Sequence, residues 1–306
     1  MNRIVITGAS GLLGLNIGLQ YADQIPILGI TNQSNVQDLP FETIAMDLIT
    51  ADFEKEILDV FQPKLVINCA AMANLDQCEK NPEQAMKINA FVPGKLASAC
   101  RQRGIKFVHI STDAVFDGTE GNYLEEDLPN PLSVYAKTKL SGEQEVIRNN
   151  PEAIIARVNF FGWSLSGKRS LSEFFFNNLS DKKQINGFTD VLFCPLYVTM
   201  LAEFLMEMAR HNLSGVYHVA SSDFMSKYEF GCAIADQFGF DRSLIKPISV
   251  NQSELVATRS LNLTLSTEKL SRDLNLTVPT VRDGIKLFYQ DYLNSFSNQI
   301  QGYASV

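Results

Sequence analysis

The chain has 306 residues, 45% of them hydrophobic, and a formal net charge of −8 at pH 7. A chain of this size can bury a substantial core, and its acidic balance argues against nucleic acid or an anionic membrane as a partner. Five cysteines without a CxxC pair and three dispersed histidines favour a reduced, cytoplasmic protein that holds no metal. Neither a leader peptide nor a membrane-spanning apolar run stands out.

The N-terminal residues 3–17 combine a short apolar run, a glycine-rich turn and a helical pattern. Gly8, Gly11 and Gly14 follow the spacing GxxGxxG rather than GxGxxG. Glycines let the backbone approach a pyrophosphate, which the N–H groups at a helix N-terminus then bind. We therefore expect a dinucleotide site that includes Gly8, Ser10, Gly11, Leu12, Leu13 and Gly14.

The ribose end of this site is expected after a second strand, at residues 25–31. The strand ends at Thr31, and Asn32 and Ser34 come after it, with neither a carboxylate nor a cation at this end. A carboxylate here would bind the 2′-hydroxyl of NAD and repel a 2′-phosphate, so its absence admits NADPH. We expect Thr31 and Asn32 to contact the cofactor, which is NADPH or NADH with NADPH weakly preferred.

Further apolar runs separated by helix-length segments predict buried parallel strands at residues 64–71, 106–113 and 153–158. This alternation indicates an α/β fold, a Rossmann-type doubly wound parallel sheet with a smaller C-terminal substrate-binding domain. Residues 1–160 would form the dinucleotide-binding domain, with later returns near 187–220. Residues 161–306 would be mainly the substrate-binding domain, discontinuous because the strand-like residues 215–220 can rejoin the sheet. Helices are predicted at residues 171–179, 199–210 and 227–238, and a frayed end at residues 295–306.

Tyr135 and Lys139 stand four residues apart in the segment 131–143. On a helix this spacing places both side chains on one face, where the ammonium would lower the pKa of the phenol. A tyrosine tuned in this way can exchange a proton near neutral pH, as nicotinamide-dependent carbonyl chemistry requires. The alternative is a solvated helix face.

Several motifs in order resemble the extended short-chain dehydrogenase/reductase family, and within it the dTDP-4-dehydrorhamnose reductases. They lie at residues 7–14, 68–79, 111–116, 135–143 and 215–220. The late Arg-Pro segment of the family resembles residues 259–265, with Ser260 in place of proline. The resemblance implies NAD(P)H-dependent reduction of the 4-keto group of a nucleotide-activated deoxysugar.

The resemblance also implies roles for individual residues. Thr112 would hydrogen-bond the substrate carbonyl, Tyr135 would protonate it as hydride arrives, and Lys139 would bind the nicotinamide ribose and tune Tyr135. The implied cofactor contacts further along the chain are Asp47, Leu48, Asn68, Ala70 and Ala71. The implied substrate contacts are Ala73, Thr112, Asn159, Phe160 and Arg259; Ala73 and Phe160 stand where the family commonly has Thr and Trp.

Other reactions on the same fold stay open. The family's 4,6-dehydratases carry Thr-Asp-Glu where this chain has Thr112, Asp113 and Ala114. Alanine in place of the glutamate cannot move a proton, so dehydration is disfavoured. A nucleotide-sugar epimerase remains an alternative, as does a non-catalytic regulatory subunit resembling that of methionine adenosyltransferase. The expected ligand is a nucleotide-diphosphate sugar, and a homodimer is left open. Lys168 and Arg169 either serve a basic pocket for a diphosphate or lie in a solvated loop.

Overall fold

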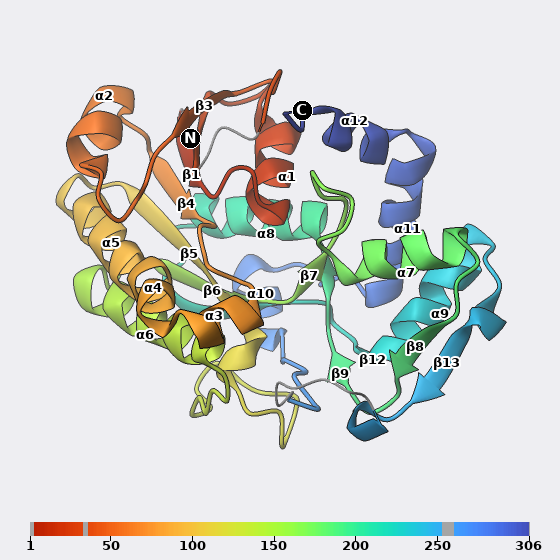
Figure 1. Cartoon of the computed structure of the whole chain (residues 1–306). Helices are drawn as coiled ribbons and strands as arrows, with labels where there is room; N and C mark the ends of the chain where they lie inside the picture. The colour runs from red at the N-terminus through yellow and green to blue at the C-terminus, as the bar shows by residue number, and fades with distance from the viewer. Residues whose placement is uncertain (1–2, 33–35, 253–259, 306) are drawn as a thin grey trace.

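The computed structural model describes residues 3–32, 36–252 and 260–305. At its centre is a parallel seven-stranded sheet with the order β11-β6-β5-β4-β1-β2-β3 (Figure 1). Its strands are β1 (Ile4–Thr7), β2 (Ile27–Thr31), β3 (Glu42–Ala45), β4 (Leu65–Asn68), β5 (Lys106–Thr112), β6 (Ile154–Val158) and β11 (Gly215–Val219). The strand order reverses at β1 and β4, which is where ligands bind in doubly wound sheets. The predicted sheet is confirmed, including the return of residues 215–220, whereas β3 was not predicted.

Both faces of the sheet are covered by helices. Ile4 and Ile6 of β1 pack on the side of α1 (Leu12–Tyr21) and α8 (Val198–Arg210). Val5, between them in the sequence, belongs to the core on the opposite side, under α5 (Val92–Gln102) and α6 (Val134–Asn149). Because successive strand residues face opposite sides, a strand covered on both faces must be apolar throughout.

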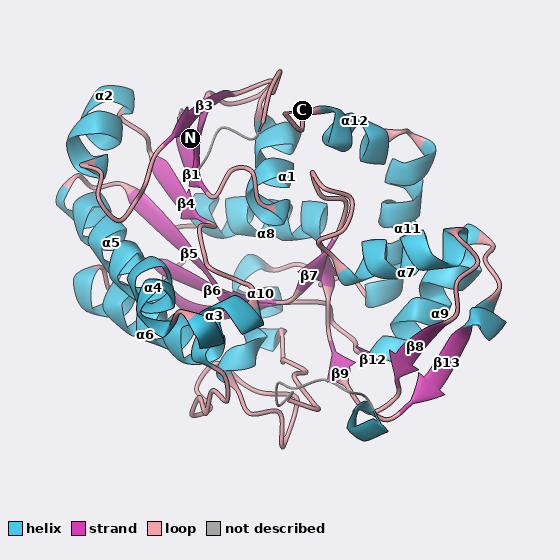
Figure 2. Cartoon of the chain, in the orientation of Figure 1, coloured by secondary structure: helices cyan, strands magenta, loops and turns pink. Residues whose placement is uncertain are grey.

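A smaller region lies beside the sheet and contains three short strand pairs (Figure 2). They are β7 (Phe160–Phe161) with β10 (Leu196–Tyr197), β8 (Ile185–Phe188) with β13 (Ile245–Ile248), and β9 (Leu192–Phe193) with β12 (Met225–Ser226). Its helices include α7 (Leu171–Ser180), α9 (Lys227–Phe238) and α11 (Val281–Leu293). Together with α8, α7 and α9 confirm the three predicted helices of this half, whereas α11 was not predicted. Trp163 stacks on Phe288 with ring centroids 4.0 Å apart, within a cluster of aromatic side chains. The domain limits stay a prediction.

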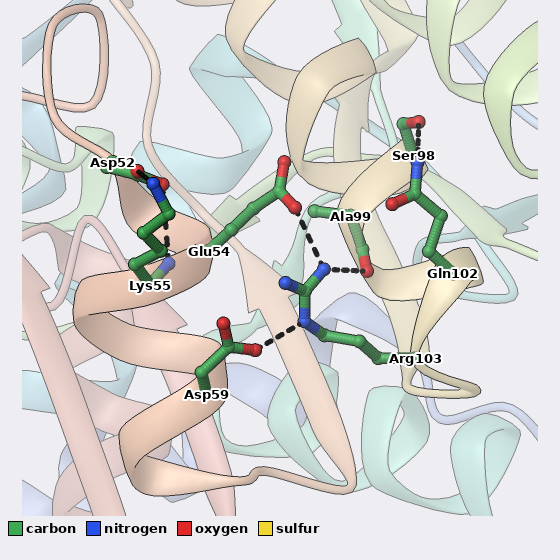
Figure 3. Close-up of polar contacts among 8 residues, drawn as sticks. All are labelled: Asp52, Glu54, Lys55, Asp59, Ser98, Ala99, Gln102 and Arg103. Carbon is green, nitrogen blue, oxygen red and sulfur yellow. Dashed lines mark hydrogen bonds and ion pairs between the residues drawn. The ribbon is translucent and has the colours of Figure 1, made fainter.

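The remaining α-helices of the described residues are α2 (Asp59–Phe61), α3 (Leu75–Lys80), α4 (Pro82–Met86), α10 (Glu268–Leu274) and α12 (Phe296–Gly302). Arg103, which follows α5, joins that helix to the chain near α2 (Figure 3). Its guanidinium donates to Asp59 at 2.8 Å and to Glu54 at 2.9 Å. These ion pairs are partly exposed and contribute modestly to stability. No helix of the described ranges is long and apolar enough to cross a membrane.

The last described residues hold regular structure, so the predicted fraying of residues 295–306 is wrong for residues 295–305, and residue 306 lies outside the described residues. Residues 296–302 form α12, in which Ile300 is fully buried. The carbonyl of Tyr303 accepts a hydrogen bond from the backbone N–H of Gln37 at 2.9 Å. Polar composition suggested fraying, but one buried isoleucine and a backbone contact hold the segment against α11 and the loop after β2.

Candidate active site

A cleft of about 260 Å³ opens where β1, β2 and β4 end. The predicted cofactor residues that line it are Gly8, Ser10, Gly11, Thr31, Asn32, Asp47, Leu48, Ala70 and Ala71. The other predicted cofactor residues do not line it: Leu12, Leu13, Gly14, Asn68, Tyr135 and Lys139. Lining residues that were not predicted as contacts are Ile30, Met46, Ile49, Cys69, Ile88, Val92 and Arg169. The apolar members carry no sequence signal, whereas Arg169 is one of the two cations noted after the sheet.

The glycine turn is shaped for a close approach of backbone. Gly8 has φ +68°, and a Cβ there would lie 2.8 Å from the backbone nitrogen of Ala70. A Cβ at Gly14 would lie 2.5 Å from the carbonyl oxygen of Gly8. The absence of side chains at Gly8 and Gly14 thus lets the start of α1 lie against the end of β4. The first turn of α1 holds no acidic residue. Unpaired N–H groups and the positive end of the helix dipole fit a dinucleotide pyrophosphate.

Asn68 supports the floor of the cleft from below. Its side chain is 1% exposed, with its oxygen 2.5 Å from the Thr7 hydroxyl and its nitrogen 3.0 Å from His109 Nδ1. Burial, and secondarily the charge of Lys139, hold the pKa of His109 well below its ordinary value. His109 is therefore a neutral structural residue, as expected for a histidine inside a strand.

Lys139 is buried under the site. Its Nζ donates to the carbonyl of Ile110 at 2.6 Å and lies 3.4 Å from His109 Nε2. Burial lowers the pKa of Lys139 to about 8, although Glu143 acts in the opposite direction. Burial raises the pKa of the Cys69 thiol, which lines the cleft, to about 12, and the charge of Lys139 acts in the opposite direction. This interaction places the Lys139 charge beside the cleft.

Tyr135 does not show the expected shift. Burial raises its pKa to about 12, outweighing a hydrogen bond with Thr112 that lowers it. The prediction that Lys139 lowers the pKa of the phenol is thus wrong for the protein alone, because desolvation of the phenolate dominates. The phenol is protonated at neutral pH and can act as a proton donor.

Thr112 and Asn159 meet at a buried carboxylate. Thr112, at the end of β5, donates its hydroxyl to Asp113 at 3.1 Å, and Asn159 donates to the other Asp113 oxygen at 2.5 Å. Burial raises the pKa of Asp113. Asp113 was not predicted as a site residue, although it stands inside the Thr-Asp-Ala motif. Phe160, the residue after Asn159, begins β7 and is half-buried.

Ala73 and Arg259, the two remaining residues predicted to bind substrate, are not seen in contact with Asp113. Ala73 is exposed in the loop before α3. Arg259 lies outside the described residues. The neighbouring Ser260, which replaces the family's proline, lies 3.4 Å from the carbonyl oxygen of Phe116.

Helix α6 carries Tyr135 and Lys139 and is anchored at both its start and its middle. Glu79 accepts a hydrogen bond from the backbone N–H of Val134 at 2.9 Å, at the first turn. Glu143, 2% exposed, pairs with Arg157 of β6 at 2.9 Å. Glu143, which ends the Tyr135 motif, therefore has a structural role, because its ion pair with Arg157 binds the helix to the sheet.

The parallel sheet, the glycine turn before α1 and the Tyr135–Lys139 pair on α6 together define an extended short-chain dehydrogenase/reductase. The family model described as "RmlD substrate binding domain" matches residues 1–294, and the chain belongs to that family.

Individual relatives agree with this assignment. The chain is 32% identical to the probable low-salt glycan biosynthesis reductase Agl14 of Haloferax volcanii, over 94% of this chain and 98% of the relative. It is 30% identical to the mouse methionine adenosyltransferase 2 subunit beta, over 88% of this chain and 81% of the relative. A crystal structure of dTDP-4-dehydrorhamnose reductase from Bacillus anthracis in complex with NADP superposes with a TM-score of 0.85. That structure is 25% identical, covering 95% of this chain and all of the other.

Proposed function

We propose that this protein uses NADPH or NADH to reduce the 4-keto group of a nucleotide-activated deoxysugar. The observation that carries the proposal is the convergence of Thr112, Tyr135 and Lys139 at the end of β5, beside a cleft shaped for a dinucleotide. The reductases among its relatives support the reaction type.

Each residue of this group has a distinct task. Tyr135 donates its phenolic proton to the carbonyl oxygen, and Thr112 holds that oxygen with its hydroxyl. A bound nicotinamide cofactor supplies the hydride. A phenol with a pKa of about 12 is fully protonated before reaction, so its proton is present for transfer. A general acid transfers its proton best when its pKa lies nearer the working pH, which assigns Lys139 the task of lowering this pKa in the complex. Lys139, whose Nζ donates to the carbonyl of Ile110, would bind the nicotinamide ribose through its other N–H groups.

Asp113 orients the substrate side of the site. In the protein alone, its carboxylate accepts hydrogen bonds from the hydroxyl of Thr112 and the amide of Asn159, which holds both side chains at the carbonyl site. The single hydroxyl proton of Thr112 would turn from Asp113 to the carbonyl oxygen when the substrate binds. Ala114, next in the chain, provides no acid or base, which leaves reduction without elimination of water. Arg259, Asn159, Phe160 and Ala73 are proposed to contact the sugar nucleotide.

The test is oxidation of NADPH and of NADH with a panel of nucleotide-linked 4-keto-6-deoxy sugars, followed at the nicotinamide absorbance. Turnover with one of them establishes the reaction, the substrate and the preferred cofactor. The Tyr135→Phe variant should lose turnover while its cofactor Kd stays near that of the wild type. Comparable turnover in that variant would remove Tyr135 as the acid.

A regulatory subunit is the second candidate, favoured by the similarity to methionine adenosyltransferase 2 subunit beta. Such a protein would bind a dinucleotide without consuming it and act through a partner chain. Cofactor binding with no turnover across the whole panel would favour this role. Interconversion of sugar epimers without net oxidation of cofactor would instead indicate an epimerase.

A further inference from the structure

A cation from outside the glycine turn faces the dinucleotide cleft. Arg169 lies between β7 and α7, in the segment that leads into the smaller region, yet it lines the same cleft as Gly8, Ser10 and Gly11. Its Nη1 atom lies 3.9 Å from the position of a Cβ built at Gly11. Gly11 is the N-cap of α1, so the guanidinium lies beside the start of that helix.

The charged residues that line the cleft leave the Arg169 guanidinium available for an anionic ligand. Among the described residues that line the cleft, Arg169 is the cation and Asp47 is the anion. No carboxylate of the described residues pairs with the Arg169 guanidinium. A pyrophosphate carries two negative charges at neutral pH, and an arginine fork can bind its oxygens through two parallel hydrogen bonds.

A buried carboxylate immobilises the backbone that presents Arg169. Glu173 of α7 is 0% exposed, and it accepts backbone N–H bonds from Ser164 at 2.6 Å, Arg169 at 2.8 Å and Ser170 at 3.0 Å. The loop is thus closed around one charged group. A contact residue on such a loop loses little conformational entropy when its ligand binds.

The same loop is bonded directly to the cofactor-binding helix. Asn16 of α1, 0% exposed, donates its side-chain N–H to the carbonyl of Trp163 at 3.0 Å. This bond fixes the start of the loop against α1, so the distance between Arg169 and the N-terminus of α1 is set by the fold.

We infer that Arg169 is a binding residue for the cofactor's pyrophosphate, which it clamps together with the N-terminus of α1. The inference rests on the proposed dinucleotide site but not on any particular sugar substrate. It commits to the pyrophosphate, which NADPH and NADH share, and not to the 2′-phosphate, which only NADPH carries.

The experiment is calorimetric titration of the wild type, Arg169→Ala and Arg169→Lys with NADPH and with NADH. Lys168→Ala is the matched control, because Lys168 is the adjacent exposed cation but lines a different hollow, with Asn177 and Gln301. Removing charge-assisted hydrogen bonds should weaken binding of both cofactors roughly tenfold to a hundredfold in Arg169→Ala. Arg169→Lys should fall between it and the wild type, and Lys168→Ala should bind as the wild type does.

Equal losses for NADPH and NADH in Arg169→Ala, with unfolding curves matching the wild type, would support the clamp. A loss confined to NADPH would overturn it in favour of a 2′-phosphate contact. Unchanged affinities, or the same loss in Lys168→Ala, would also overturn it. If the wild type bound neither cofactor, the dinucleotide site itself would fail and this inference with it. A wild type that binds both but turns over no sugar would leave the clamp standing and remove the proposed reaction.

Discussion

Breaking one side of the buried ion pair between Glu143 and Arg157 should cost a large share of the stability of this protein. Arg157 bonds both Glu143 oxygens, through Nε at 3.1 Å and Nη2 at 2.9 Å, and Ser111 donates to the same carboxylate at 2.5 Å. The two charged side chains are 2% and 4% exposed. Glu143→Gln keeps the shape but leaves the guanidinium buried without a counter-charge.

Breaking one side of a buried pair costs about 3–5 kcal/mol, against a typical total stability of about 5–15 kcal/mol. We therefore expect Glu143→Gln to lower the free energy of unfolding by about 3–5 kcal/mol. Replacing both partners, Glu143→Leu with Arg157→Met, should recover most of the loss, because neither charge is then left unpaired.

The assay is urea unfolding followed by circular dichroism at pH 7. Glu145→Gln is the control on the same helix, since Glu145 pairs with Arg148, which is 69% exposed. That change should cost below about 1 kcal/mol. The reasoning would be refuted if Glu143→Gln were as mild as the control, or if the double variant were as unstable as the sum of its single changes.

Three further changes follow from the site. Burial lowers the pKa of Lys139 from 10.5 to about 8, so the unfolded chain binds more protons between those values. Lys139→Met should therefore unfold at a higher urea concentration than the wild type at pH 7. The difference between the two urea midpoints should shrink as pH rises from 8 toward 10.5, because the wild type no longer has to bury a charged ammonium. A difference in midpoint that does not vary with pH would contradict this. Gly8→Ala should weaken dinucleotide binding and destabilise the fold, whereas Gly104→Ala, at φ +61° with open space around it, should cost only about 1 kcal/mol in urea unfolding; equal effects would contradict the close packing at Gly8. Asp113→Asn should lower kcat while leaving the cofactor Kd unchanged, because an amide nitrogen, which donates, replaces one of the two oxygens that accept from Thr112 and Asn159; an unchanged kcat would remove Asp113 as an orienting group.

The local features of this protein were predictable from its sequence. Continuous apolar runs predicted strands buried on both faces, and GxxGxxG after the first of them predicted the dinucleotide turn. The spacing of Tyr135 and Lys139 placed both on one helix, α6, which the structure confirms. Patterns of this kind are local, because helix and strand periodicity determine which side chains share a face.

The energetics of the site depended on segments far apart in the chain. Spacing alone suggested that Lys139 lowers the pKa of Tyr135, but burial by residues of other elements raises it to about 12. Asp113 became a site residue only when β5 brought it to Asn159, after β6, and Arg169 only when the chain after β7 returned to α1. Solvation and charge pairing depend on what packs around a group in space, so only the tertiary structure could decide them.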